Sequence, residues 1–201
     1  PATVPYVASV SARPSLSPTP SRSVEQPTGA RESIVPGCAA AYGLGGTPAE
    51  QARAKGPKLY NLLGTPSEGY ALIYTEKLVI NCTIGGDVMA YNAGGGPVHS
   101  LNWIPSPYRI DFQSGSRNVK RDGTAEVSER MGGRISEDVA RVVLESAGHT
   151  AEAHLENGTF VVALTYDGAD YSGRPTLRAY DAAGNVLPDP NFPSCLKTPT
   201  G

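Results

Sequence analysis

The chain has 201 residues, of which 39% are hydrophobic, so it can bury a modest core and is not disordered throughout. Its 17 basic and 19 acidic residues give a net charge of −2, which excludes the basic balance typical of nucleic-acid-binding proteins. No stretch reaches the roughly 20 apolar residues of a membrane-spanning helix. We therefore expect contact with a membrane only through a segment upstream of this sequence.

Residues 1–32 have the composition of a disordered tether. Pro and Ser make up about two-fifths of the first 30 residues, without apolar periodicity, so the segment cannot bury enough surface to fold. Because the sequence starts at Pro1 rather than Met, we expect a signal peptide or a membrane helix before it. A terminus without function is the alternative interpretation.

Residues 33–128 are predicted to form a strand-rich region with one short helix. The segment 34–42 fits either one or two helical turns or a buried approach to the first strand. Thr47, Pro48 and Glu50 form a capping box with Pro at the first helical position, which predicts a helix over 48–63, interrupted at Gly56-Pro57.

After the predicted helix, the chain becomes rich in β-branched and aromatic residues, which are typical of strands. The segments 70–74 and 78–84 are predicted to pair as a hairpin. Shorter strands are expected at 88–92, 101–104 and 108–112. The glycines of 94–97 are typical of a loop, and 113–123 of a long connection.

Residues 129–201 are predicted to form a β-sandwich-like module, either separate or sharing one core with the preceding region. Strands are expected at 139–145, 150–155, 159–164 and 176–180, at the regular spacing of a sandwich. Asn157-Gly158 is the strongest hairpin signal in the chain. The fold class predicted for the whole chain is mainly β, with a minor helical part.

The last 70 or so residues carry a resemblance to a known group. It rests on the segments 133–144, 157–160 and 178–187, whose turns and strands are similar to the C-terminal module of uncharacterised actinobacterial envelope proteins. The resemblance implies an immunoglobulin-like or transthyretin-like sandwich in a membrane-anchored or secreted protein. It implies no catalytic residue.

The three cysteines, Cys38, Cys82 and Cys195, lack the spacing of a zinc or thioredoxin-like site. One disulfide with one spare thiol fits an extracellular location, and Cys38–Cys82 is favoured because it would fix a loop or helix on a central strand. Closing that loop stabilises by about 3–4 kcal/mol on the chain-entropy model. Three reduced, buried cysteines remain the alternative.

No catalytic constellation, metal site or cofactor motif is recognisable. Ser194 and Lys197 match a Ser-x-x-Lys pattern, but its companion motifs are missing. The histidines His99, His149 and His154 lack the spacing of zinc hydrolases and are interpreted as surface residues. No catalytic residue and no metal ligand is therefore predicted.

Aromatic residues concentrate in the first half of the chain, where Tyr and Trp are typical of interfaces. Most are expected to pack in a core. An exposed pair, Trp103 and Tyr108, is the predicted binding site. The function expected is an extracytoplasmic sensing or protein-interaction domain without catalysis, whose partner is an unknown protein or envelope ligand. A secreted hydrolase with scattered residues and a structural spacer are the alternatives.

Overall fold

The computed structural model describes residues 31–44, 56–85, 91–98, 101, 104, 107–168 and 175–188. The fold is mainly β, as predicted, and the predicted tether lies outside these residues except for Arg31 and Glu32. The elements in chain order are α2 (Ile34–Ala41), β1 (Lys58–Gly64), β2 (Gly69–Tyr74), β3 (Leu78–Ile84), β4 (Tyr91–Pro97), β5 (Tyr108–Val119), β6 (Ala125–Ile135), β7 (Arg141–Ser146), β8 (His149–Glu152), β9 (His154–Glu156), β10 (Thr159–Asp167) and β11 (Thr176–Tyr180).

The strands form three antiparallel sheets. Sheet A has the order β1-β2-β3-β4, sheet B the order β5-β6-β10-β9, and sheet C the order β11-β7-β8. Hairpins connect β5 with β6, β7 with β8 and β9 with β10. Ala147-Gly148 and Asn157-Gly158 turn with positive φ at both residues, which is the backbone that two-residue hairpins require.

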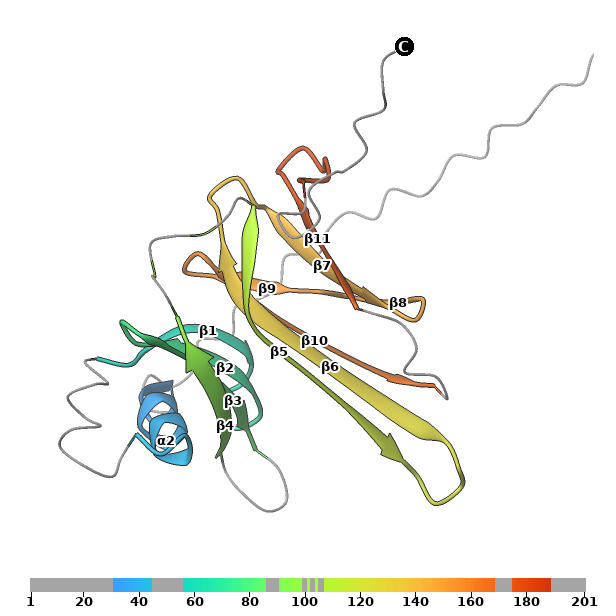
Figure 1. Cartoon of the computed structure of the whole chain (residues 1–201), viewed down its shortest axis with the longest axis horizontal. Helices are drawn as coiled ribbons and strands as arrows, with labels where there is room; N and C mark the ends of the chain where they lie inside the picture. The colour runs from blue at the N-terminus through green and yellow to red at the C-terminus, as the bar shows by residue number, and fades with distance from the viewer. Residues whose placement is uncertain are drawn as a thin grey trace, which may run out of the picture.

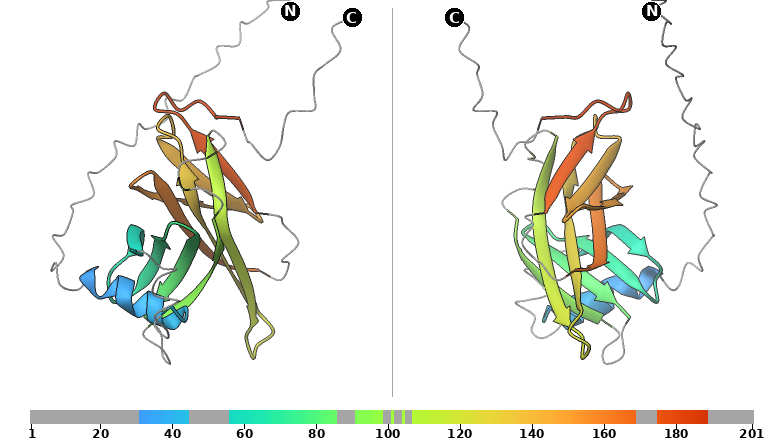
Figure 2. Two further views of the ribbon diagram at one scale, coloured as in Figure 1. Left: turned by 60° about the vertical axis from the view of Figure 1, so that its left-hand side comes forward. Right: turned by 90° about the vertical axis from the view of Figure 1, so that its right-hand side faces the viewer.

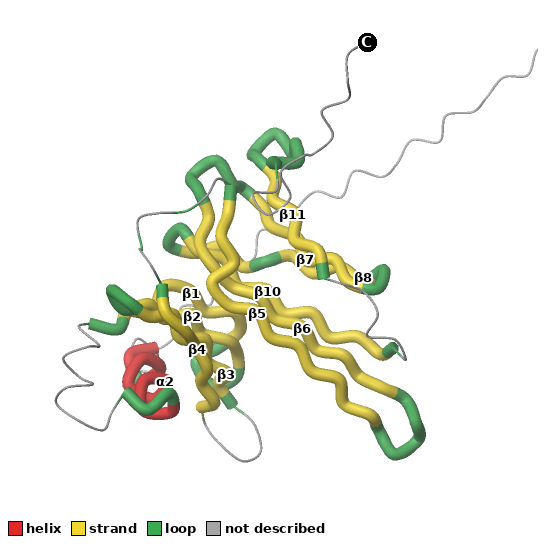
Figure 3. Tube along the Cα trace, in the orientation of Figure 1, coloured by secondary structure: helices red, strands yellow, loops and turns green. Residues whose placement is uncertain are grey.

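The sheets stack in layers in the order α2, sheet A, sheet B, sheet C (Figures 1 and 3). The alternation along β10 shows why sheet B is central, since neighbouring residues of a strand point to opposite faces. Phe160 and Val162 pack in the core toward sheet C, whereas Val161 packs against sheet A. Sheet B is therefore shared by two interfaces.

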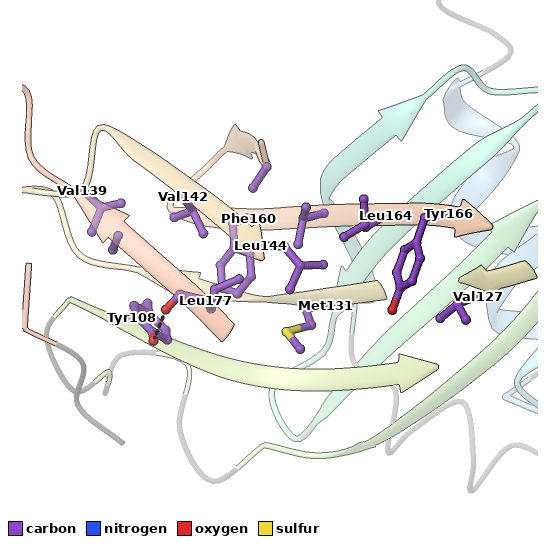
Figure 4. Close-up of a cluster of buried hydrophobic side chains, with 13 residues drawn as sticks. Tyr108, Val127, Met131, Val139, Val142, Leu144, Phe160, Leu164, Tyr166 and Leu177 are labelled. Carbon is purple, nitrogen blue, oxygen red and sulfur yellow. Dashed lines mark hydrogen bonds between the residues drawn. The ribbon is translucent and has the colours of Figure 1, made fainter. Parts of the chain in front are cut away.

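The interface between sheets B and C is an apolar sandwich core (Figure 4). Phe160, Leu144, Val142 and Met131 are at most 2% exposed. Tyr108 also lies in this core, and its hydroxyl donates to the carbonyl oxygen of Leu177 at 3.1 Å. The predicted β-sandwich is confirmed. The predicted boundary between residues 128 and 129 falls inside β6.

Helix α2 covers the outer face of sheet A. Ile34 and Cys38 are buried against Ile73, Ile80 and other apolar residues of the sheet. A disulfide joins Cys38 to Cys82 of β3, as predicted, with Cα atoms 5.8 Å apart. The helical alternative for 34–42 is thus the one observed.

The helix predicted over 48–63 is wrong in its second half, because residues 58–64 form strand β1. The run Leu59–Leu63 has apolar residues at a helix-like spacing, but a β-bulge at Tyr60 causes that spacing. The first half of the predicted helix lies outside the described residues.

Two predicted loops are also wrong. Residues 94–97 belong to β4, where Gly95 allows close pairing, since a Cβ there would lie 2.1 Å from the carbonyl oxygen of Val79. Residues 113–119 extend β5, and only a short turn closed by Lys120 and Thr124 follows. The central strand β6 was not predicted, because Glu129 and two glycines interrupt its apolar alternation.

Candidate binding cleft between two sheets

A cleft of about 300 Å³ opens where sheet A meets sheet B. One wall consists of the tyrosines of sheet A, and the opposite wall comes from β6 and the β9–β10 turn. The lining residues are Tyr60, Tyr74, Leu101, Ile104, Arg134, Ile135, Asn157, Gly158 and Thr159. The cleft thus combines aromatic, apolar and polar groups, as ligand sites in proteins do.

A β-bulge in β1 directs Tyr60 toward this cleft. Leu59 pairs with Ile73 and Asn61 with Leu72, so Tyr60 is the extra residue. The bulge turns both Tyr60 and Asn61 to the side of sheet B, while the flanking leucines 59 and 62 pack toward α2. The ring of Tyr60 meets that of Tyr74 edge to face, with centroids 5.2 Å apart.

A second bulge, in β5, directs Asp111 to the same interface. Ile110 pairs with Gly133 and Phe112 with Gly132, which leaves Asp111 as the extra residue. The glycine pair in β6 makes room for it: a Cβ on Gly132 would lie 2.4 Å from the Phe112 ring, and one on Gly133 would lie 1.9 Å from the Arg109 carbonyl oxygen. Bulges that re-aim a side chain in this way are common next to functional sites.

Asp111 is the centre of a buried polar network. Arg134 donates to both carboxylate oxygens, from Nε at 2.7 Å and from a terminal nitrogen at 2.9 Å, which is a bidentate ion pair. The Tyr74 hydroxyl donates to the same carboxylate at 2.7 Å, and Arg109 Nε lies 3.2 Å from it. The side chains of Asp111 and Arg134 are only 2% and 6% exposed.

Two members of the network, Tyr74 and Arg134, have raised pKa values. Burial raises the pKa of the Tyr74 hydroxyl, and the charge of Asp111 and its hydrogen bond raise it further. Burial opposes the charged form of Arg134, but the hydrogen bonds and charge of Asp111 outweigh it and raise the pKa of the guanidinium. Tyr74 is therefore a neutral donor and Arg134 a permanent cation.

A set of amide hydrogen bonds holds β1 against the β9–β10 hairpin. Asn61 is fully buried, and its Nδ2 donates to the carbonyl oxygens of His154 at 3.0 Å and Thr159 at 3.3 Å. His154 Nδ1 lies 2.9 Å from Asn61 Oδ1. Asn157 Nδ2 donates to the carbonyl oxygen of Tyr60 at 3.0 Å. The position of the bulge is therefore fixed from sheet B.

Further along the interface, Arg130 repeats the pairing of an arginine with a tyrosine. Its guanidinium lies 4.8 Å from the centroid of Tyr70 and donates to Thr83 of β3. Arg134 stands 6.0 Å from the centroid of Tyr74 in the same manner. Arg130 and Arg134 lie on the face of β6 that sheet A covers. The interface between sheets A and B thus combines arginine–tyrosine pairs with an apolar cluster that includes Leu72, Val79 and Val161.

The structure describes one of the two predicted binding residues, Tyr108, and not the other, Trp103. Tyr108 is 1% exposed, so the expectation that it is exposed is wrong; its ring fits the sandwich core and packs edge to face on Phe160. Trp103 lies outside the described residues, although Leu101 and Ile104 on either side of it in sequence line the cleft. The prediction for Trp103 remains untested.

The chemistry that this arrangement supports is binding. The ionic groups of the network pair with one another, and they hold the walls of the cleft at a fixed geometry. Within the described residues, no group of three or more His, Cys, Asp or Glu side chains is placed to hold a metal ion. No helix in the same residues is long and apolar enough to cross a membrane.

Sequence reasoning missed Tyr60, Asp111 and Arg134. The sequence contains one indication of this irregularity, the glycine pair Gly132-Gly133 in β6. It lies opposite the part of β5 where Asp111 breaks the two-residue period of the strand. Glycine inside a strand is typical of a bulge or of close backbone approach. That signal indicates irregularity but does not say which side chain it directs.

Comparison with known proteins gives no match: no family model, no curated protein and no solved structure is similar to this chain.

Proposed function

We propose that this chain is an extracytoplasmic interaction domain of a membrane-tethered or secreted bacterial protein. In this proposal the cleft between sheets A and B recognises a protein or another envelope ligand. The observation that carries it is a pair of β-bulges at one cleft: the first places Tyr60 in its wall, and the second places Asp111 behind the wall, where it binds the lining residues Tyr74 and Arg134. Bulges disrupt strand pairing, so two of them at one interface are better explained by a site than by stability.

The location rests on the disulfide. Cys38 and Cys82 are both at most 2% exposed, so the bond is a buried structural link rather than a reactive surface pair. Structural disulfides are typical of oxidising compartments. Sheets B and C have the four-plus-three strand count of an immunoglobulin-like sandwich, although their strand order differs, so the proposed kinship with immunoglobulin-like or transthyretin-like modules of actinobacterial envelope proteins rests on the count and on the sequence resemblance.

The walls indicate the kind of ligand. Tyr60 offers a ring, Leu101 and Ile104 offer apolar surface, and the exposed Asn157 adds a polar group. An amphipathic group with one aromatic or aliphatic anchor and hydrogen-bonding neighbours suits this combination. A partner polypeptide that inserts one such side chain is the form of ligand we favour.

Site-specific photo-crosslinking in the native host tests this function. Tyr60 is replaced by p-benzoyl-phenylalanine, which keeps an aromatic ring at the cleft. The matched control carries the same residue at Tyr180, a tyrosine of sheet C that is half-buried like Tyr60 and lies outside the cleft. We expect a defined adduct with an envelope component from position 60 and none from position 180.

Two outcomes would contradict the proposal. Equal adducts from both positions would mean that the cleft has no special role. Thiol labelling of the protein recovered from its host gives the second: Cys38 and Cys82 found reduced there would remove the extracytoplasmic location.

A further inference from the structure

A second cavity, of about 500 Å³, lies in sheet A where β1 and β3 end and β2 begins. Its wall includes the side chains of Leu63, Glu68, Tyr70 and Thr83, together with three glycines that leave the space open. None of its lining residues belongs to the cleft that contains Tyr60. A volume of this order is typical of small-molecule sites in proteins, so the cavity is a second candidate site.

Arg130 of β6 contacts two residues of this wall from sheet B. Its guanidinium lies 4.8 Å from the centroid of the Tyr70 ring, and a terminal nitrogen donates to the Thr83 hydroxyl. Tyr70 and Thr83 are direct partners across β2 and β3, so their side chains stand next to each other on one face of sheet A. These two contacts hold the guanidinium against the cavity wall.

Arg130 differs from Arg134, which lies on the same face of β6, in having no acidic partner. Arg134 forms a bidentate ion pair with Asp111. Among the described residues, no carboxylate forms an ion pair with Arg130, and Thr83 supplies the one hydrogen-bond acceptor of its guanidinium. Because a guanidinium carries several N–H donors in a planar fork, the remaining ones suit the two oxygens of a ligand carboxylate.

The face of sheet B next to Arg130 carries hydroxyl groups. β5 and β6 extend beyond sheet A as a long hairpin, so this part of the face is not covered by sheet A (Figures 1 and 2). Ser128 shares the face with Arg130, because residues two apart on a strand point to the same side. Its hydroxyl lies 3.1 Å from that of Thr165 on β10, and Ser116 of β5 is its partner on the other side. A row of hydroxyls therefore adjoins Arg130.

The remaining side chains of the cavity narrow the choice of ligand. Glu68 is exposed in its wall, and its carboxylate accepts hydrogen bonds from hydroxyls but repels a ligand that is purely anionic. Leu63 and Tyr70 are partly buried and add apolar surface. A ligand that suits all of these groups carries one carboxylate, several hydroxyls and an apolar face. A sugar with a carboxylate has this combination.

We propose that this cavity binds the carboxylate-bearing unit of an acidic saccharide. Arg130 binds the carboxylate, Thr83 and Ser128 exchange hydrogen bonds with the sugar hydroxyls, and Glu68 accepts from a further hydroxyl. The ring of Tyr70 holds the guanidinium in place. The hydroxyl row along sheet B gives neighbouring units of a longer saccharide a surface with which to form hydrogen bonds.

NMR titration of the full chain with D-glucuronate, at fixed pH and ionic strength, tests the site. Glucose and acetate are the matched ligands, because glucose lacks the carboxylate and acetate lacks the hydroxyls. We expect glucuronate to shift the amide resonances of Tyr70 and Thr83 and the Nε–H resonance of Arg130 in a saturable manner. Its affinity should exceed that of either smaller-function ligand by about tenfold, since each satisfies one part of the site.

Substitution of the arginine tests its role. Arg130→Gln should weaken glucuronate binding by about tenfold, because it removes the charge-assisted hydrogen bonds. Arg130→Lys keeps the charge without the planar fork, so it should retain part of the affinity. The matched control is Arg141→Gln, since Arg141 also lies on a tyrosine ring, that of Tyr180 at 3.9 Å, but in sheet C. This control should bind glucuronate as the wild-type chain does, and retained amide dispersion confirms that each variant is folded.

Several outcomes would overturn the proposal. Glucuronate that causes no saturable shift at Tyr70 and Thr83, or equal losses in Arg130→Gln and Arg141→Gln, would remove the site. Acetate that binds as tightly as glucuronate would overturn the saccharide as its ligand, and so would tighter binding of N-acetyl-alanyl-alanine, whose carboxylate represents a peptide terminus. None of these outcomes bears on crosslinking from position 60, so this site and the cleft are tested separately.

Discussion

Sheet B has two faces that differ in chemistry. Toward sheet C it packs an apolar core in which Phe160 meets Leu144 and Val142 of β7, with Glu129 buried beside them. Toward sheet A it presents apolar residues such as Val161 together with a cluster of charged groups, Arg130, Arg134 and Asp111, which meet tyrosines. Strand β10 contributes adjacent residues to the two faces, Phe160 toward sheet C and Val161 toward sheet A.

The difference indicates a division of roles. Apolar burial is non-directional and contributes stability in proportion to area. Buried ion pairs and amide hydrogen bonds recover little net free energy, but they hold groups in one geometry. Both interfaces therefore stabilise the fold through apolar burial, and the charged groups of the A/B interface in addition position the walls of the cleft.

The largest effect should come from the apolar face. Phe160→Ala should lower the free energy of unfolding by about 4 kcal/mol, because it leaves a large cavity between sheets B and C. Val161→Ala, one residue along on the face toward sheet A, should cost less than half of that. Urea unfolding of both variants measures the two losses of unfolding free energy. Equal losses would contradict the difference between the two faces of sheet B.

Removing one partner of the ion pair should also be costly. Asp111→Ala should destabilise by about 3 kcal/mol, since the Arg134 charge remains buried without its carboxylate. Restoring neutrality with Arg134→Met in the same chain should return much of this loss. A double-mutant cycle measures the coupling, and strictly additive losses would refute the network.

The disulfide should stabilise sheet A specifically. Cys38→Ala with Cys82→Ala should cost about 3 kcal/mol, because the bridge closes a loop of 44 residues in the unfolded chain. Hydrogen exchange should report faster opening in α2 and β3 than in β7 and β10. Uniform acceleration through all three sheets would mean that the layers do not differ in this way.

The sandwich core contains one residue that breaks its pattern. Glu129 is 1% exposed; Oε1 accepts from Ser146 at 3.0 Å, whereas Oε2 has no hydrogen-bond partner. Glu129→Met should therefore stabilise by about 1 kcal/mol, and Ser146 still reaches the Tyr166 hydroxyl at 3.2 Å. Thermal unfolding checks the sign, and a loss of stability would show that the carboxylate is needed.

The smallest effect concerns pH at the turn after β11. Hydrogen bonds from the side chain and backbone N–H of Asn185 lower the pKa of Asp181 below its ordinary value of 3.8. This contribution is present above that value and is lost as the pH falls through the lowered pKa. Asp181→Asn should reduce the drop in melting temperature between about pH 5 and about pH 3, and an unchanged drop would contradict it.

The sequence was sufficient for regular elements whose pattern is local. The strands 78–84 and 176–180 and the turn at Asn157-Gly158 followed from composition and spacing. The pairing of Cys38 with Cys82 was favoured among open alternatives because it joins a loop or helix to a central strand, and it is the pairing observed. Irregular elements could not be predicted in this way. A bulge shifts the strand period by one residue, so β1 resembled a helix and Asp111 had no assigned face.

The cleft depended on contacts that the sequence does not indicate. Asp111 and Arg134 are 23 residues apart, and Tyr74 belongs to a different sheet. Tyr108 was expected at the surface as one of an exposed aromatic pair with Trp103, but its hydroxyl finds a backbone acceptor inside the core. Long-range partners of this kind decide whether a tyrosine is a site residue or a core residue.

The most direct test of the division of roles is photo-crosslinking from position 60 in a chain that also carries Tyr74→Phe, Asp111→Leu and Arg134→Met. These changes remove the buried ion pair together with the tyrosine hydroxyl that binds it. Arg109 loses its contact with Asp111, but its side chain is 27% exposed and its charge stays hydrated, so the fold should persist. If the network positions the cleft, the position-60 adduct should disappear although the chain remains folded. An adduct of undiminished yield would contradict the account, because the cleft would then recognise its partner without the network that is proposed to position it.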